Sequence, residues 1–340
     1  MRVLVTGGAG YIGSHTVRCL ESRGDAVIVL DSLEHGHPAS IGETPLVVAD
    51  MGDRERLDRL FQSERIDAVV HFAGNKAVDE SLREPVRYFE NNVSKTLVLL
   101  DAMLRADVRM LVFSSSCAVY GTPDRQPVDE ESELRPENPY GESKLLIERM
   151  LHWLDACRGL RHVSLRYFNA AGAALDGSIG ENWANAANLV PVVMKAAMGV
   201  APSVQVFGSD YPTADGSAIR DYIHVVDLAD AHALALDHLA ADGTSTTLNL
   251  GTGRGASVRE VIAMTERVSG RRIVVQDAER RPGDPAAIWA DNGRARSELG
   301  WSPRFGLEEI IESAWRWHST HPNGFDDVAI ARNLVQRSAQ

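Results

Sequence analysis

A glycine-rich segment near the start of the chain, TGGAGYIG at residues 6–13, places the strongest limit on the fold. It lies between a short apolar run and a helix-like pattern. Gly7, Gly10 and Gly13 recur every three residues, which permits a tight turn, close approach of the backbone to a pyrophosphate, and tight packing of a helix on a strand. The N-terminus of the following helix offers N–H groups and a positive dipole to an anion. A plain surface turn is disfavoured by the apolar runs on both sides, so the segment predicts a dinucleotide-binding site.

The apolar runs along the first half of the chain predict the fold class. Runs at residues 3–5, 27–30, 46–48, 68–72, 110–113 and 163–166 alternate with amphipathic stretches. Short buried strands that alternate with helices indicate right-handed βαβ units and a doubly wound parallel sheet, so we expect an α/β, Rossmann-type fold.

The length of the chain and a change in its sequence pattern predict two lobes. The 340 residues exceed the roughly 250–300 that a single core usually holds. After residue 170 the alternation of apolar runs with amphipathic stretches becomes less regular. We expect a Rossmann domain over residues 1–170, with later segments returning to it, a smaller substrate-binding lobe over 171–320, and a tail over 321–340.

Several side chains follow the predicted strands at their carboxyl ends, where such sheets bind ligands. Asp31 ends the second run, and its carboxylate can accept hydrogen bonds from an adenosine ribose while repelling a 2′-phosphate. Because no arginine occurs in the next six residues, we expect NAD rather than NADP. Asp50 and Met51 follow the third run, where Asp50 can reach the adenine edge. Ala73 and Gly74 follow the fourth and let the backbone pass close to a cofactor.

A second group of residues has the chemistry of proton transfer. Tyr140 and Lys144 are four apart, so on a helix they share one face. An adjacent ammonium and a positively charged nicotinamide would both favour the phenolate, and would lower a pKa that is ordinarily near 10. Ser114 and Ser116 follow the strand expected at residues 110–113, about 24 residues earlier. Ser116 could orient a substrate hydroxyl. Together these residues predict a proton acceptor beside a hydride acceptor.

Composition excludes several other classes of function. The chain has 47 acidic against 35 basic residues, a net charge of −12, so it is a poor partner for nucleic acid. No apolar run approaches the roughly 18 residues that span a bilayer. The three cysteines do not have metal-ligand spacing, and we expect no metal site and a reducing, cytoplasmic compartment.

Six motifs together resemble one known family: TGGAGYIGSH, HFAGNKAVDES, NPYGESK, RYFNAAGA, RDYIHVVDLAD and RRPGD. They are similar to the extended short-chain dehydrogenase/reductase superfamily and, within it, to the UDP-glucose (UDP-galactose) 4-epimerase family, over nearly the whole chain. The resemblance implies tightly bound NAD that is regenerated in each cycle, and interconversion of UDP-galactose and UDP-glucose through transient oxidation at sugar C4. By this resemblance Tyr140 is the base, Lys144 supports it, and Ser116 orients the hydroxyl.

The resemblance also extends the set of expected ligand contacts. The cofactor contacts are expected to be Gly7, Gly10, Tyr11, Ile12, Gly13, Asp31, Ser32, Asp50, Met51, Phe72, Ala73, Gly74, Lys76, Asn91, Ser114, Tyr140, Lys144 and Phe168. The substrate contacts are expected to be Lys76, Ser116, Tyr140, Asn169, Asn188, Leu189, Gln205, Val206, Phe207, Arg220, Arg281, Asp284 and Ile288. Arg220 and Arg281 would hold the diphosphate, and the bulk of Ile288 would limit the substituent at sugar C2.

Several alternatives stay open at this point. The enzyme could be another UDP-sugar 4-epimerase that acts on an N-acetylhexosamine, a pentose or a uronate. A non-catalytic NAD- or nucleotide-sugar-binding regulator and an NAD-dependent dehydrogenase are further alternatives. A 4,6-dehydratase would need an Asp-Glu pair where this chain has Cys117 and Ala118. The same position often carries Ala-Thr in the family, so one hydroxyl is missing here. The resemblance also implies a homodimer, formed through helices at about residues 92–105 and 141–157.

Overall fold

The computed structural model describes residues 1–186, 188–281 and 283–325, so most of the expected tail, residues 326–340, lies outside the described residues. The centre of the fold is a seven-stranded sheet in the order β11-β6-β5-β4-β1-β2-β3, in which all paired strands are parallel. Its strands are β1 (Arg2–Thr6), β2 (Ala26–Asp31), β3 (Leu46–Val48), β4 (Ala68–His71), β5 (Met110–Ser116), β6 (Arg161–Tyr167) and β11 (Thr246–Leu250). The predicted α/β, Rossmann-type fold is confirmed.

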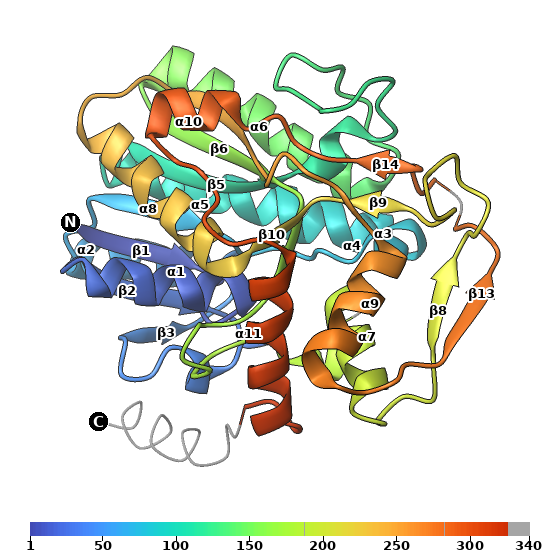
Figure 1. The fold of residues 1–340 in the computed structure, drawn as a ribbon. Helices are drawn as coiled ribbons and strands as arrows, with labels where there is room; N and C mark the ends of the chain where they lie inside the picture. The colour runs from blue at the N-terminus through green and yellow to red at the C-terminus, as the bar shows by residue number, and fades with distance from the viewer. Residues whose placement is uncertain (187, 282, 326–340) are drawn as a thin grey trace.

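Helices cover both faces of this sheet, which explains why its strands are apolar on both sides. Along β1, Val3 and Val5 point into one core cluster and Leu4 into the other. The first face packs against α1 (Tyr11–Ser22), α8 (Val225–Ala240) and α10 (Gly293–Leu299). The second packs against α2 (Arg54–Ser63), α5 (Lys95–Arg105) and α6 (Pro139–Arg158) (Figure 1).

A second group of elements packs beside the carboxyl edge of the sheet. Figure 1 shows α7 (Leu189–Ala197), α9 (Val258–Ser269) and α11 (Leu307–Thr320) beside the pair β8 (Val204–Phe207) and β13 (Val275–Ala278). Their shared core includes Val193, Val204 and Ile310. Short strands join this region to the rest: β7 (Asn169–Ala171), β9 (Ile219–Arg220), β10 (Tyr222–His224), β12 (Ala256–Ser257) and β14 (Ala287–Ile288).

Two features of the local structure differ from the sequence expectation. β5 continues through Ser116, so the three serines belong to the strand and are paired with β6. A helical stretch over residues 85–105 consists of α4 (Pro85–Tyr88), a π-helical turn over Phe89–Ser94, and α5. Before it lies α3 (Val78–Arg83), which the sequence analysis did not predict. Among the described residues, no helix is long and apolar enough to cross a membrane.

Candidate active site

A cavity of about 650 Å³ opens along the carboxyl ends of the central strands. Its wall includes the ends of β1 and β2, the segments after β3 and β4, and the start of α6. All the predicted cofactor contacts lie in the described part of the chain, and only Ser114 and Phe168 are not part of this wall. Both of these side chains are buried. The predicted cofactor contacts thus converge on one site, whereas of the predicted substrate contacts only Lys76 and Tyr140 belong to this wall.

The glycine segment lies at this cavity in a form that only glycine permits. Gly7 has a φ of +70°, and a Cβ there would lie 2.6 Å from the backbone nitrogen of Ala73. A Cβ on Gly13 would lie 2.3 Å from the carbonyl oxygen of Gly7. The helix α1 begins after Gly10, which has no side chain to cap the first N–H groups. The first turn of α1 therefore fits a pyrophosphate, as in other dinucleotide-binding turns.

The carboxylate of Asp31 is built into the turn that follows β2. Its two oxygens accept hydrogen bonds from the backbone nitrogens of Ala9, at 3.0 Å, and Leu33, at 2.9 Å. Burial raises the pKa of Asp31, and these two hydrogen bonds oppose the increase. Asp50 accepts from Lys95 Nζ at 2.6 Å and stays half exposed. Each carboxylate therefore keeps lone pairs for a ligand on the cavity side.

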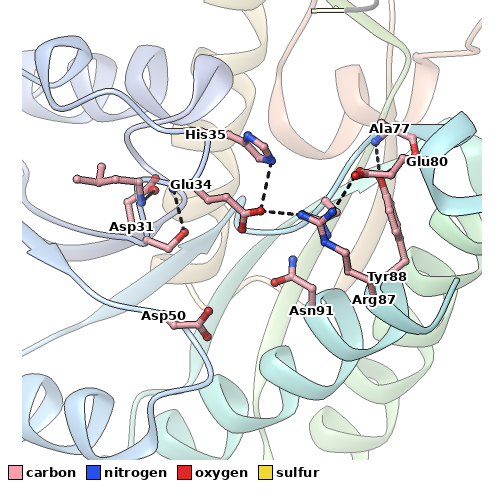
Figure 2. Close-up of polar contacts among 12 residues, drawn as sticks. Asp31, Glu34, His35, Asp50, Ala77, Glu80, Arg87, Tyr88 and Asn91 are labelled. Carbon is pink, nitrogen blue, oxygen red and sulfur yellow. Dashed lines mark hydrogen bonds and ion pairs between the residues drawn. The ribbon is translucent and has the colours of Figure 1, made fainter. Parts of the chain in front are cut away.

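Figure 2 shows an ion-pair chain at this end of the cavity. Arg87 of α4 pairs with Glu34, from the segment after β2, at 2.7 Å, and with Glu80 of α3 at 2.9 Å. The phenol of Tyr88 donates to Glu80 at 2.8 Å. Asn91, in the π-helical turn, lies beside this chain and lines the cavity. The loop after Asp31 is therefore tied to α3 and α4 by ion pairs.

Ser116, Tyr140 and Lys144 come together at the end of β5. Ser116 is close enough to the Tyr140 phenol to oppose the increase of its pKa. Lys144 Nζ donates to the carbonyl oxygen of Ser114 at 2.9 Å, and lies 5.9 Å from the centroid of the Tyr140 ring. The helix α6 is fixed at its start by Asn138, whose side chain accepts from the backbone nitrogen of Gly141. The predicted four-residue spacing therefore places both groups on the side of α6 that faces the cavity.

Burial dominates the electrostatics of this pair. It raises the pKa of Tyr140, with Tyr167 adding to the increase and Ser116 opposing it. It lowers the pKa of Lys144 to about 8, although the charge of Glu148 opposes the change. The phenol and the amine are thus both biased towards their neutral forms by the protein itself. The predicted lowering of the Tyr140 pKa, which also invokes a nicotinamide cation, stays a prediction.

The predicted diphosphate-binding residues form two pairs. Arg220 pairs with Asp284 rather than with the neighbouring Asp221, whose carboxylate instead accepts backbone N–H groups. The guanidinium of Arg281 lies 4.0 Å from the centroid of the Phe207 ring. Phe207 ends β8, Arg220 ends β9, and Arg281 and Asp284 lie between β13 and β14.

Three other predicted substrate contacts have settings that limit their roles. Val206 is fully buried in the core of the second lobe, so only its backbone can contact a ligand. Ile288 is 5% exposed and packs in a cluster with Phe168. Gln205 alternates outward from Val206 and is exposed. The expected roles of these residues remain predictions.

The cavity wall also contains residues that the sequence analysis missed: Glu80, Lys95, Tyr167 and Glu181. Glu80 and Tyr167 lie inside two of the recognised motifs, so the signal was available for them. Lys95 is four positions after Asn91 on a helical path, which is a weaker signal. Glu181 has no motif or spacing that indicates a site.

The parallel sheet, the uncapped glycine turn and the Ser-Tyr-Lys group beside the cavity are together typical of a dinucleotide-binding α/β enzyme. A family model described as the NAD dependent epimerase/dehydratase family matches residues 3–251. The chain belongs to this family.

Individual relatives narrow the comparison. A UDP-glucose 4-epimerase of Halalkalibacterium halodurans is 49% identical over 96% of this chain and 98% of its own. A UDP-glucose-4-epimerase from Stenotrophomonas maltophila, solved with bound NAD and formylated UDP-arabinopyranose, superposes with a TM-score of 0.92 at 45% identity, over 95% of this chain and 99% of its own. A UDP-glucose 4-epimerase from Bifidobacterium longum, solved with NAD+ and UDP, superposes with a TM-score of 0.91 at 42% identity. The match covers 96% of this chain and 100% of its own. The resemblance predicted from the motifs is confirmed.

Proposed function

We propose that this protein is an NAD-dependent isomerase that interconverts UDP-galactose and UDP-glucose. The observation that carries the proposal is the grouping of Ser116, Tyr140 and Lys144 at the end of β5, next to a cavity whose glycine turn fits a dinucleotide. The similarity to UDP-glucose 4-epimerases over nearly the full chain supports the same activity.

The reaction needs no net oxidation, because it only inverts C4 of the sugar. Tyr140 as phenolate takes the proton of the C4 hydroxyl, which Ser116 orients by hydrogen bonding. Bound NAD would supply the acceptor for the C4 hydride and return it to the opposite face. The 4-keto sugar rotates in the pocket to present its other face before the phenol of Tyr140 gives the proton back.

The phenolate requires a source of positive charge, since burial alone raises the pKa of Tyr140. We attribute this charge to Lys144 and to the oxidised nicotinamide ring together. The ammonium of Lys144 is held by the Ser114 carbonyl at the end of β5, so its direction is fixed before any ligand binds.

The nucleotide has to be held firmly while the sugar rotates in the pocket. Arg220 and Arg281 are the proposed diphosphate contacts, since a guanidinium offers a fixed fork of donors to such a group. In the structure Arg220 is paired with Asp284, and we propose that Arg220 exchanges part of this pairing for the diphosphate.

A direct experiment supplies UDP-galactose to the purified protein without added NAD and measures UDP-glucose. Conversion without accumulation of NADH is the expected result. Steady production of NADH from added NAD would instead identify a dehydrogenase. Retention of NAD with no turnover of any UDP-sugar would identify a binding regulator.

The range of sugars is a separate question for the same assay. Ile288 lies in an apolar cluster with Val119, Leu145 and Phe168, so a larger group at C2 has to displace packed side chains. We therefore propose UDP-glucose and UDP-galactose as the main substrates. UDP-N-acetylgalactosamine, a UDP-pentose and a UDP-uronate are the competitors to test alongside them.

We also propose a cytoplasmic homodimer. Leu97 on α5 and Trp153 on α6 are exposed, at 47% and 66%, and they lie on the two helices expected to form the interface. The three cysteines are free thiols, as in a reducing compartment. Replacement of Trp153 by Glu should halve the molecular mass measured by light scattering, and an unchanged mass would contradict this interface.

A further inference from the structure

One wall of the cofactor cavity is formed by residues 180–182, which we call the bridge segment. Its central residue, Glu181, is only 6% exposed. The Oε1 atom of Glu181 accepts a hydrogen bond from Lys76 Nζ at 3.3 Å and another from Asn188 Nδ2 at 3.3 Å. Lys76 follows β4 of the central sheet, whereas Asn188 immediately precedes α7. One buried carboxylate oxygen therefore connects the two sides of the site.

The backbone around Glu181 is fixed independently of these two contacts. The indole nitrogen of Trp317 donates to the carbonyl oxygen of Glu181 at 3.0 Å. A Cβ on Gly180 would lie 2.5 Å from the ring of Trp317, so this close packing requires glycine. On the other side, Asn182 Nδ2 and His37 Nε2 are 2.8 Å apart. The bridge segment thus spans the cavity from α11 to the loop after β2.

We propose that Glu181 is a positioning residue that orients Lys76 and Asn188 for the uridine nucleotide. The inference rests on the proposed function, which makes both of these residues ligand contacts. The Lys76 side chain is long and 64% exposed, so it would otherwise lose rotamer freedom on binding. An N–H group of Asn188 bonded to Glu181 fixes where its carbonyl oxygen and its second N–H group point.

Removal of the charge of Glu181 is expected to change the ligand affinity in opposite directions under two explanations of its role. A carboxylate in a cavity for a diphosphate repels the ligand, and its pairing with Lys76 offsets this repulsion. If the charge were the only contribution, its removal would tighten binding. If Glu181 orients its two partners, removal of the charge weakens binding, because the hydrogen bond from Asn188 becomes a neutral one and the bond from Lys76 loses the charge of its acceptor.

The test uses NAD-loaded protein and isothermal titration with UDP, so it requires no turnover. Glu181→Gln, which keeps the shape, should raise the Kd for UDP about fivefold to tenfold. The matched control is Glu308→Gln, an exposed carboxylate that pairs with Arg267 at 3.2 Å on the outside of the second lobe, and its Kd should equal that of the wild type.

A double-mutant cycle distinguishes orientation from a general loss of structure. Because Glu181 acts in part through Asn188, Glu181→Gln combined with Asn188→Ala should weaken UDP binding by less than the product of the two single losses. In turnover assays, KM for UDP-galactose should rise with the Kd while kcat stays within about twofold.

Two results would overturn the inference: an unchanged or lower Kd in Glu181→Gln, or losses that multiply in the double variant. Failure of the proposed function would look different, because UDP would still bind with the same pattern while no UDP-sugar was epimerised.

Discussion

The buried ammonium of Lys144 gives a stability prediction that can be worked from the structure. Lys144 is 5% exposed, and burial lowers its pKa from 10.5 to about 8. A shift of about 2.5 units at 1.36 kcal/mol each is a cost of about 3 kcal/mol for holding the charged form in the folded protein. Replacement by methionine removes this cost and keeps most of the side-chain volume, but leaves the carbonyl of Ser114 without its donor, which costs about 1 kcal/mol.

The sign of the pH dependence follows from proton binding. Below about pH 8 the lysine is protonated in both states, and the full cost is present. Between about pH 8 and 10.5 the unfolded chain binds more protons than the folded chain, so wild-type stability rises with pH through this window. Lys144→Met should therefore be more stable than the wild type by about 2 kcal/mol at pH 7. This advantage should shrink above pH 8 and reverse near pH 10.

Urea unfolding of NAD-free wild type and Lys144→Met at pH 7, 9 and 10 measures this difference. Other groups that titrate in the window contribute equally to both proteins, so they cancel from the comparison. Two findings would refute the reasoning: a variant that is less stable at pH 7, or a difference that does not change with pH. The same variant should lose epimerase activity, which would show that the ammonium is retained for chemistry rather than for stability.

Three further predictions concern other parts of the site. Tyr140→Phe should keep its NAD, measured by absorbance of the released nucleotide, and lose about 10²- to 10⁴-fold in turnover; near-wild-type turnover would mean that another group is the base. Gly13→Ala should be isolated without NAD, because its Cβ would lie 2.3 Å from the Gly7 carbonyl oxygen, and a full complement of NAD would contradict the proposed approach of α1 to the pyrophosphate. Arg166→Met should lower the free energy of unfolding, measured in urea, by about 3–5 kcal/mol, because it leaves the carboxylate of Glu148 buried without its ion-pair partner. Replacement of both residues by methionine should regain most of this loss.

Much of the fold could be predicted from local patterns. The expected strand at residues 46–48 agrees with β3 at both ends. The glycine spacing and the strand-end position of Asp31 were sufficient to place the cofactor cavity. These features succeed because hydrophobic period and turn chemistry are properties of neighbouring residues, and because ligands bind at the carboxyl ends of parallel strands.

The remaining features depend on contacts between distant residues, which a single sequence does not encode in any spacing. Lys76 and Glu181 are 105 positions apart and share a hydrogen bond across the cavity. The ion pair of Glu34 with Arg87 joins a loop to a helix 53 positions later. The π-helical turn at Phe89–Ser94 also has no period that distinguishes it from an ordinary helix. These contacts become visible only when the sheet order brings the elements together.

The same burial that positions Tyr140 and Lys144, the proposed proton-transfer residues, also disfavours their charged forms in the protein alone. Removal from water disfavours both the phenolate of Tyr140 and the ammonium of Lys144, as their opposite pKa shifts show. A permanent positive charge in the cavity would favour the phenolate without displacing Lys144 from the Ser114 carbonyl. In this arrangement the base gains its reactivity only where a hydride acceptor is also present. Coupling of proton acceptance to cofactor occupancy is what a reaction without net oxidation requires, because a proton removed without a hydride acceptor leads to no product.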